Sequence, residues 1–142
     1  MMMILCDRED LVAEFHTAMG LDVDSDPRMS LLKLREKLLW EECAEVCEEL
    51  NKMEMTIIHG GKPSKKDWAN LLKECCDLQY VLSGTIVSLN KLKNLDFDTA
   101  FELVHESNMS KLDDEGKPVY REDGKVTKGP NYKAPDLSDL IV

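Results

Sequence analysis

The sequence has few of the features that mark exported, membrane-spanning or nucleic-acid-binding proteins. No stretch approaches the roughly 18 consecutive apolar residues of a membrane span. The opening MMMILCDRED lacks the basic start and long apolar stretch of a signal peptide. Basic residues are outnumbered, because 18 Lys and Arg stand against 28 Asp and Glu, a net charge of −10. Phosphate backbones and anionic lipids attract basic surfaces, so we expect neither nucleic acid nor membrane as a partner.

Cysteine is scarce and odd in number. Five cysteines without a secretion signal favour reduced thiols and a cytoplasmic location. Cys43, Cys47 and the adjacent Cys75 and Cys76 raise the alternative of a four-thiolate zinc site. Neighbouring cysteines on a helix point about 100° apart, which disfavours a shared metal. We therefore expect these cysteines to be small buried hydrophobic residues.

Glycine and proline are also few and gather in two places, which leaves long stretches suited to helices. Asp7, Ser64 and Asp96 are expected N-caps, and Gly20 is an expected helix stop. The sequence thus predicts an all-α, four-helix bundle with helices at 8–19, 30–56, 65–90 and 97–111. We expect one domain over 1–142, with a helical core at 7–111 and an irregular arm at 112–142. The arm is either a loose tail or a small irregular hairpin with turns at DEGK and EDGK.

Acidic residues continue an apolar stripe on the second predicted helix. Leu31, Leu34 and Leu38 step by three and four residues, which predicts the buried face of that helix. The next positions on the stripe fall in EECAE at 41–45, whose three acids are Glu41, Glu42 and Glu45. Burying carboxylates is costly unless protons or cations compensate their charge.

The third predicted helix carries a matching pair of acids. Glu74 and Asp77 lie three residues apart beside the apolar face, as Glu42 and Glu45 do on the second helix. If the two helices pack antiparallel, the two pairs face each other. Four oxygen ligands are typical of a site for Mg²⁺ or Mn²⁺. The alternative is an acidic helix face exposed to solvent.

Paired motifs on consecutive helices resemble a known family. EECAE at 41–45 followed by ECCD at 74–77 matches the EExxE and ExxD signature of the all-α nucleoside triphosphate pyrophosphohydrolases, the MazG-like superfamily. SNMSK at 107–111 and the arm resemble the phosphoribosyl-ATP pyrophosphohydrolase-like branch, which includes phage-type and dUTPase-like members. The resemblance implies a homodimer or homotetramer. It also implies hydrolysis of a nucleoside triphosphate between its α- and β-phosphates, with dUTP or another deoxynucleotide as the candidate substrate.

The resemblance also implies roles for individual residues. A divalent metal, Mg²⁺ or Mn²⁺, would be held by Glu42, Glu45, Glu74 and Asp77. Glu41 would then be an outer ligand or the base that takes a proton from the attacking water.

The substrate would be held by residues of two other helices. Asn108 and Lys111 would bind its phosphates, unless they only form a frayed helix end. His16 would line the base pocket, unless it is a surface or core histidine. The non-enzymatic alternative is a metal-stabilised helical module that binds nucleotides or partners without hydrolysing them.

Overall fold

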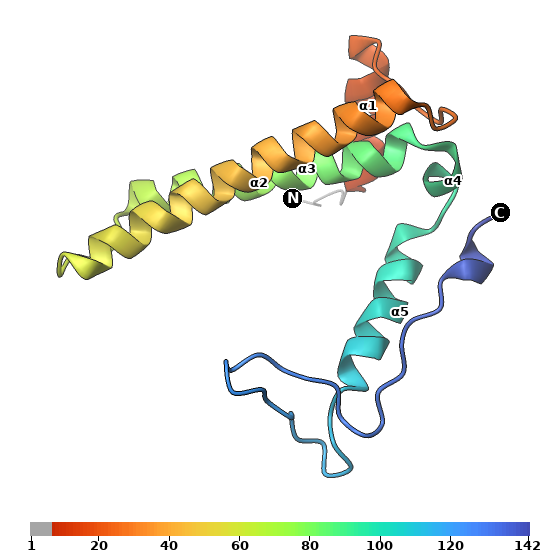
Figure 1. The fold of residues 1–142 in the computed structure, drawn as a ribbon. Coiled ribbons are helices and arrows are strands. Elements are labelled where there is room, and N and C mark those ends of the chain that lie inside the picture. Colours follow the sequence, from red (N-terminus) through yellow and green to blue (C-terminus); the bar gives the residue numbers. More distant parts are fainter. Residues whose placement is uncertain (1–6) are drawn as a thin grey trace, which may run out of the picture. The chain divides into compact units, whose positions relative to one another are not determined.

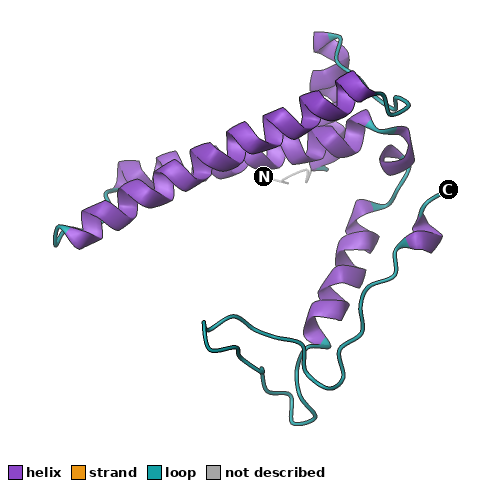
Figure 2. Ribbon diagram, in the orientation of Figure 1, coloured by secondary structure: helices purple, strands orange, loops and turns teal. Residues whose placement is uncertain are grey.

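The computed structural model describes residues 7–142, and every regular element among them is helical (Figures 1 and 2). The elements are α1 (Arg8–Met19), α2 (Met29–Ile58), α3 (Lys65–Ser88), α4 (Asn90–Lys93), α5 (Phe97–Met109) and a 3₁₀ turn, η1 (Ser138–Leu140). The prediction of an all-α fold is confirmed. Within the described part of the chain, no helix is both long and apolar enough to cross a membrane.

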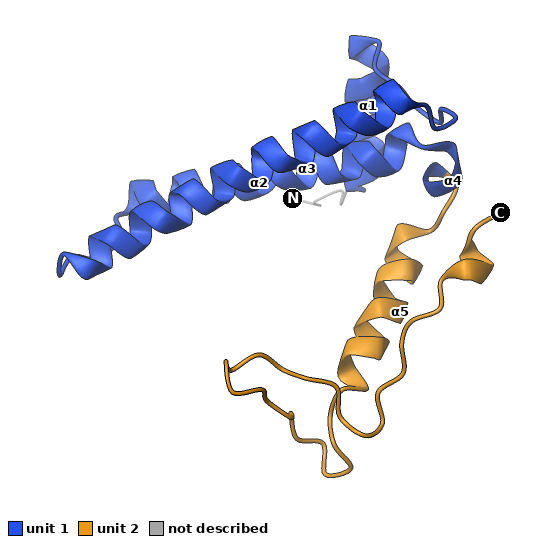
Figure 3. Ribbon diagram, in the orientation of Figure 1, with its two compact units in different colours: residues 1–93 blue, residues 94–142 orange. Residues whose placement is uncertain are grey.

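The chain forms two compact units (Figure 3). The first runs to Lys93 and contains α1 to α4, and the second comprises Asn94–Val142. Helix α5, which the sequence suggested belongs to the helical core, therefore groups with the C-terminal arm.

Capping side chains fix the helix ends where the sequence indicated. The Asp7 carboxylate accepts a hydrogen bond from the Glu9 amide, and Gly20 closes α1 in the left-handed conformation at φ 70°. Ser64 and Asp67 form a reciprocal capping box at the start of α3. Asp96 caps α5 through the Thr99 amide.

Helix α2 begins one residue earlier than expected and without a capping side chain. Its N-cap, Arg28, instead forms an ion pair of 2.9 Å with Asp22 in the preceding loop. That loop runs along the C-terminal end of α3, where the Ser25 amide donates to the Ser88 carbonyl at 2.8 Å. Helix α3 correspondingly ends at Ser88, two residues before the predicted end, and α4 follows as a separate turn.

Helices α2 and α3 lie side by side and antiparallel, joined by a short loop (Figure 1). Helix α1 packs on α3, and most of the buried side chains of this unit gather where these helices meet: Val12, His16, Leu31, Arg35, Ser83, Ile86, Val87 and Ser88. The predicted stripe on α2 is partly wrong, because Leu34 is exposed and Arg35 is buried in its place. The inward-facing line on α2 steps from the buried Leu31 and Arg35 to the half-buried Leu38, a heptad spacing that fits antiparallel packing.

Large apolar side chains remain exposed along α2 and α3. They include Leu32, Trp40, Leu50, Ile57, Trp68 and Leu72, each at least 44% exposed. All four described cysteines are exposed as well, so the expectation that they are buried hydrophobic residues is wrong for the single chain. One chain therefore leaves much of its apolar surface uncovered.

In the second unit the arm folds as two tight turns, the irregular hairpin of the two alternatives. Gly116 and Gly124 adopt φ values of 74° and 83° in these turns, and Tyr120 forms a single antiparallel bridge with Val126. The side chain of Asp113 accepts hydrogen bonds from backbone amides in the first turn. These are Asx-type turns, which explains why Asp and Gly recur in the arm.

The arm returns to the end of α5 and is bound to it. The Ser107 hydroxyl donates to the Lys133 carbonyl at 2.7 Å, and the Lys133 amide donates to Ser110 Oγ at 3.0 Å. The Gly129 amide donates to the Lys111 carbonyl at 3.0 Å, an approach so close that a Cβ at Gly129 would collide with that oxygen. A bulkier residue than glycine is therefore excluded there.

Candidate active site

Antiparallel pairing of α2 and α3 brings four acids together in the middle of the hairpin. One carboxylate oxygen each from Glu42, Glu45, Glu74 and Asp77 lies within 4.8 Å of the other three. The structure thus brings together the four residues proposed as metal ligands. In the described part of the chain, no other set of three or more acidic, histidine or cysteine residues is close enough to hold a metal.

Burial within this cluster is uneven. Glu42, Glu74 and Asp77 are half-buried, whereas Glu45 is exposed. The Oε2 atoms of Glu42 and Glu74 are shielded from solvent and have no hydrogen-bond partner. Buried polar atoms are normally satisfied, so two unpartnered carboxylate oxygens on residues of one cluster are the feature that a bound cation would explain. The donor set, four carboxylates and no sulfur or nitrogen, fits a hard divalent cation.

Mutual repulsion perturbs the cluster. The close Glu74 carboxylate and the negative charge of Glu42 raise the pKa of Glu45. The chain also contributes a cation to the cluster, because Lys73 Nζ is 2.7 Å from Asp77 Oδ2 and 3.3 Å from Glu74 Oε1. These two carboxylates raise the pKa of Lys73. Sequence reasoning missed Lys73, although its spacing of four residues from Asp77 was the available signal.

Glu41 lies outside the cluster. Its side chain is 52% exposed and approaches Lys37 Nζ at 3.8 Å. The expectation that the stripe buries Glu41, Glu42 and Glu45 is therefore wrong in part, because only Glu42 is half-buried. Adjacent helical residues point about 100° apart, which explains why Glu42 faces α3 and Glu41 does not. A part for Glu41 in catalysis stays a prediction.

Two helical turns before Glu42, the seam, meaning the interface between α2 and α3, contains a polar residue that sequence reasoning also missed. Arg35 is 6% exposed, donates to the Val81 carbonyl at 2.8 Å and to Thr85 Oγ1 at 3.2 Å, and burial lowers its pKa. Gly84 lies against it, as a Cβ there would be 2.5 Å from Arg35 Nη2. Gly84 thus marks a point of close packing between α3 and α2.

His16 is part of this buried group. Its side chain is 3% exposed, and its Nδ1 lies 2.8 Å from the Asp22 carbonyl. It lines a cavity of about 150 Å³ with Arg35 and Leu38. This burial favours the core-histidine alternative, and contact of His16 with a substrate stays a prediction.

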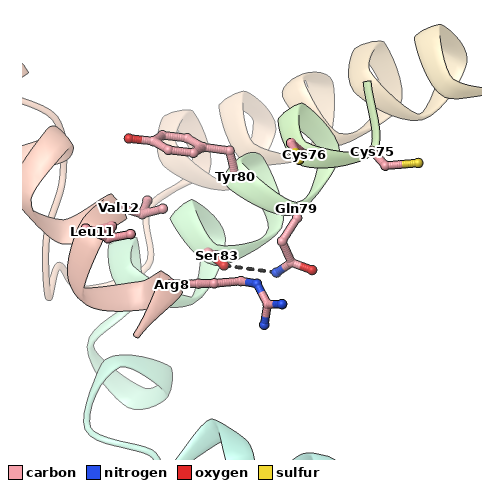
Figure 4. Close-up of a pocket in the computed structure, with 8 residues that line it drawn as sticks. All are labelled: Arg8, Leu11, Val12, Cys75, Cys76, Gln79, Tyr80 and Ser83. Carbon is pink, nitrogen blue, oxygen red and sulfur yellow. Dashed lines mark hydrogen bonds between the residues drawn. The ribbon is translucent and has the colours of Figure 1, made fainter. Parts of the chain in front are cut away.

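A larger pocket of about 330 Å³ lies between α1 and α3 (Figure 4). It is lined by Arg8, Leu11, Val12, Cys75, Cys76, Gln79, Tyr80 and Ser83. The Gln79 amide points at Ser83 and donates to its hydroxyl at 3.0 Å, so one wall is polar (Figure 4). The pocket begins at Cys75 and Cys76, which lie between Glu74 and Asp77 in the chain but on another face of α3.

Asn108 and Lys111 belong to the second unit. Asn108 is exposed in the last turn of α5, and Lys111 follows that helix at the point where Gly129 holds the chain. Their binding of phosphates stays a prediction.

The comparisons with known proteins bear on this geometry. The model of the family described as phosphoribosyl-ATP pyrophosphohydrolase matches residues 12–108. The chain belongs to the phosphoribosyl-ATP pyrophosphohydrolase family. That family is part of the MazG-like all-α superfamily, as the paired acidic motifs predicted. No curated protein matches the chain.

The matched region contains all four clustered acids and ends within α5, so the arm lies beyond it. Membership makes this chain one of a family of hydrolases that act on phosphoric anhydrides and are typically metal-dependent.

Proposed function

We propose that this family member is a pyrophosphohydrolase of nucleoside triphosphates that depends on Mg²⁺ and accepts Mn²⁺ in its place. It would cleave the anhydride between the α- and β-phosphates and release a nucleoside monophosphate and pyrophosphate. The observation that carries the proposal is the cluster of Glu42, Glu45, Glu74 and Asp77 with its two unpartnered, shielded oxygens. Without a cation this cluster would repel a triphosphate.

Each acid has a part in this proposal. Glu42, Glu45, Glu74 and Asp77 would hold the metal, which when bound supplies charge neutralisation for phosphate oxygens and lowers the pKa of bound water. Glu41 lies outside the cluster and is exposed, and its carboxylate would take the proton of the attacking water.

The nucleoside would occupy the pocket between α1 and α3. Its volume of about 330 Å³ lies in the range of small-molecule sites, and it combines apolar walls with Gln79 and Ser83 as hydrogen-bonding groups. We favour dUTP or another deoxynucleoside triphosphate as the substrate. Phosphoribosyl-ATP is the less favoured choice, because the arm lies outside the matched family region. Asn108 and Lys111 would bind the phosphates.

We further propose that the functional form is a homodimer or homotetramer. Trp40, Trp68 and Leu72 are 70%, 57% and 66% exposed on α2 and α3, the helices that carry the acids. Exposed apolar surface of this extent typically marks an interface, and a second copy of the same hairpin offers a complementary apolar face. A sedimentation mass of one chain at micromolar concentration would contradict this.

A nucleotide panel tests the activity. The full chain is incubated with each nucleoside triphosphate in Mg²⁺ or in chelator, and pyrophosphate, orthophosphate and nucleoside monophosphate are measured. We expect pyrophosphate only with metal. Binding of metal and nucleotide without turnover would instead indicate the non-catalytic module, and release of orthophosphate and a nucleoside diphosphate would refute the bond assignment.

Matched variants test the site. Asp77→Asn removes a ligand and should lower kcat roughly 100-fold or more, since loss of even an outer partner of a metal ligand costs roughly 10- to 100-fold. Glu48→Gln removes one acid of the same charge from an exposed position on α2 and should leave the rate within about twofold. Full activity of the Asp77→Asn variant would make this assignment of the site untenable.

A further inference from the structure

Lys73 places a positive charge on the acid cluster itself. Its ammonium nitrogen is 2.7 Å from Asp77 Oδ2 and 3.3 Å from Glu74 Oε1. These are the two acids that α3 contributes to the cluster of four. The side chain of Lys73 is 65% exposed, so it reaches the carboxylates from the solvent side and is not held in place by packing.

The ammonium and a divalent metal compete for the same two carboxylates. Mg²⁺ binds carboxylate oxygens at about 2.1 Å, so a metal on Asp77 Oδ2 would lie within roughly 5 Å of Nζ if Lys73 stayed in place. Two like-charged cations at that separation repel each other strongly. One of them must move, and Lys73 is the one whose flexible stem is free to turn into solvent.

We propose that Lys73 is a built-in counter-cation of the metal site: it occupies Asp77 and Glu74 while the metal is absent and is displaced when the metal binds. This inference rests on the metal site of the proposed function. Lys73 thereby sets how tightly the metal is held, because each binding event must first break its two ion pairs. It also limits the repulsion among four carboxylates in the metal-free protein.

This role predicts that one variant has a higher metal affinity and a lower thermal stability. Lys73→Gln removes the competitor, so it should bind Mn²⁺ more tightly, by roughly threefold to tenfold given the usual strength of partly exposed ion pairs. The same change removes the charge that offsets the acids, so the metal-free variant should melt at a lower temperature than the original protein. An ordinary surface ion pair would lower the melting temperature and leave the metal affinity unchanged.

Lys52 provides a matched control on the neighbouring helix. Its side chain is also 65% exposed and forms an ion pair of 3.0 Å with Glu49, which is not part of the cluster. Lys52 is near enough for the negative charge of Glu74 to contribute to raising its pKa. Lys52→Gln thus removes one charge near the site without removing a group bound to a ligand oxygen.

The experiment measures Mn²⁺ binding to the full chain without nucleotide, by electron paramagnetic resonance of the free ion. We expect tighter binding by Lys73→Gln, and affinities within about twofold of the original for Lys52→Gln and the charge-preserving Lys73→Arg. Equal affinity of Lys73→Gln and the original protein would overturn this inference alone. Equal tightening by the Lys52 and Lys73 variants would also overturn it, because net charge would then explain the effect. No Mn²⁺ binding by the original protein would overturn both the inference and the proposed metal site.

Discussion

Gly84→Ala offers a sharp test of the buried polar group that anchors the α2–α3 hairpin. Gly84 lies inside α3, where alanine is normally favoured over glycine by about 1 kcal/mol. Here the added Cβ would be 2.5 Å from Arg35 Nη2 and 3.0 Å from His16 Nε2. Nothing can relax cheaply, because the guanidinium is buried and bound to Val81 and the imidazole is held by the loop carbonyl at Asp22.

The expected magnitude follows from the contacts that must shift. Displacing the Arg35 guanidinium weakens its hydrogen bonds to Val81 and Thr85, and bonds of charged groups contribute about 1.5–3 kcal/mol each. Partial loss of these two hydrogen bonds costs more free energy than the higher helix propensity of alanine contributes. We expect the free energy of unfolding to fall by about 2 kcal/mol, which for a chain of this length lowers the melting temperature by roughly 6 °C.

The Arg35→Met background separates this cause from others. Methionine keeps most of the apolar stem and removes the buried charge, so the single change should be close to neutral. In that background the Cβ added at position 84 meets a flexible side chain, and Gly84→Ala should be neutral or stabilising. The coupling between the two changes should reach about 2 kcal/mol. Thermal melts by circular dichroism at one protein concentration measure it. The reasoning is refuted if Gly84→Ala stabilises the original protein, or if it costs the same in both backgrounds.

Two more outcomes are expected. Gly129→Ala should release the arm from the end of α5, because the added Cβ would collide with the Lys111 carbonyl. Limited proteolysis should then cut the arm faster, and an unchanged cleavage rate would contradict the contact. The four exposed cysteines of α2 and α3 should react with a thiol reagent quickly in dilute protein and more slowly as the protein concentration rises, because association through these helices covers them. A labelling rate that is independent of protein concentration would argue against that interface.

The sequence predicted the helices well because their ends carry local chemical signals. Asp7, Ser64 and Asp96 are capping residues whose side chains satisfy orphan amides within three positions along the chain. Where the ends depend on distant contacts, the prediction missed them. Helix α3 stops at Ser88 because the loop around Ser25 takes over its backbone hydrogen bonds, and no local signal indicates that pairing.

The four clustered acids were predictable for a similar reason. Their spacing of three residues on each helix, with a helix break between the pairs, brings them together once the helices pair antiparallel. The exposure of Glu41 was missed because the prediction placed all three acids of EECAE on one buried stripe. Glu41 and Glu42 are adjacent and point about 100° apart, so they cannot both face α3. The burial of Arg35 was missed because a basic side chain breaks an apolar pattern, although its heptad position relative to Leu31 and Glu42 was the available signal.

The distribution of burial along the hairpin explains how stability and function are divided. Leu31, Ile86 and Val87 are buried at the end where α1 packs, and Met53 is buried near the connecting loop. The middle of the seam contains the acids, where an apolar layer would otherwise bind the two helices together. Repulsion there is tolerated because packing at both ends holds the helices in register. The packing at both ends therefore holds the acids close together without a cation. Their mutual repulsion then favours the binding of a cation, which would relieve it.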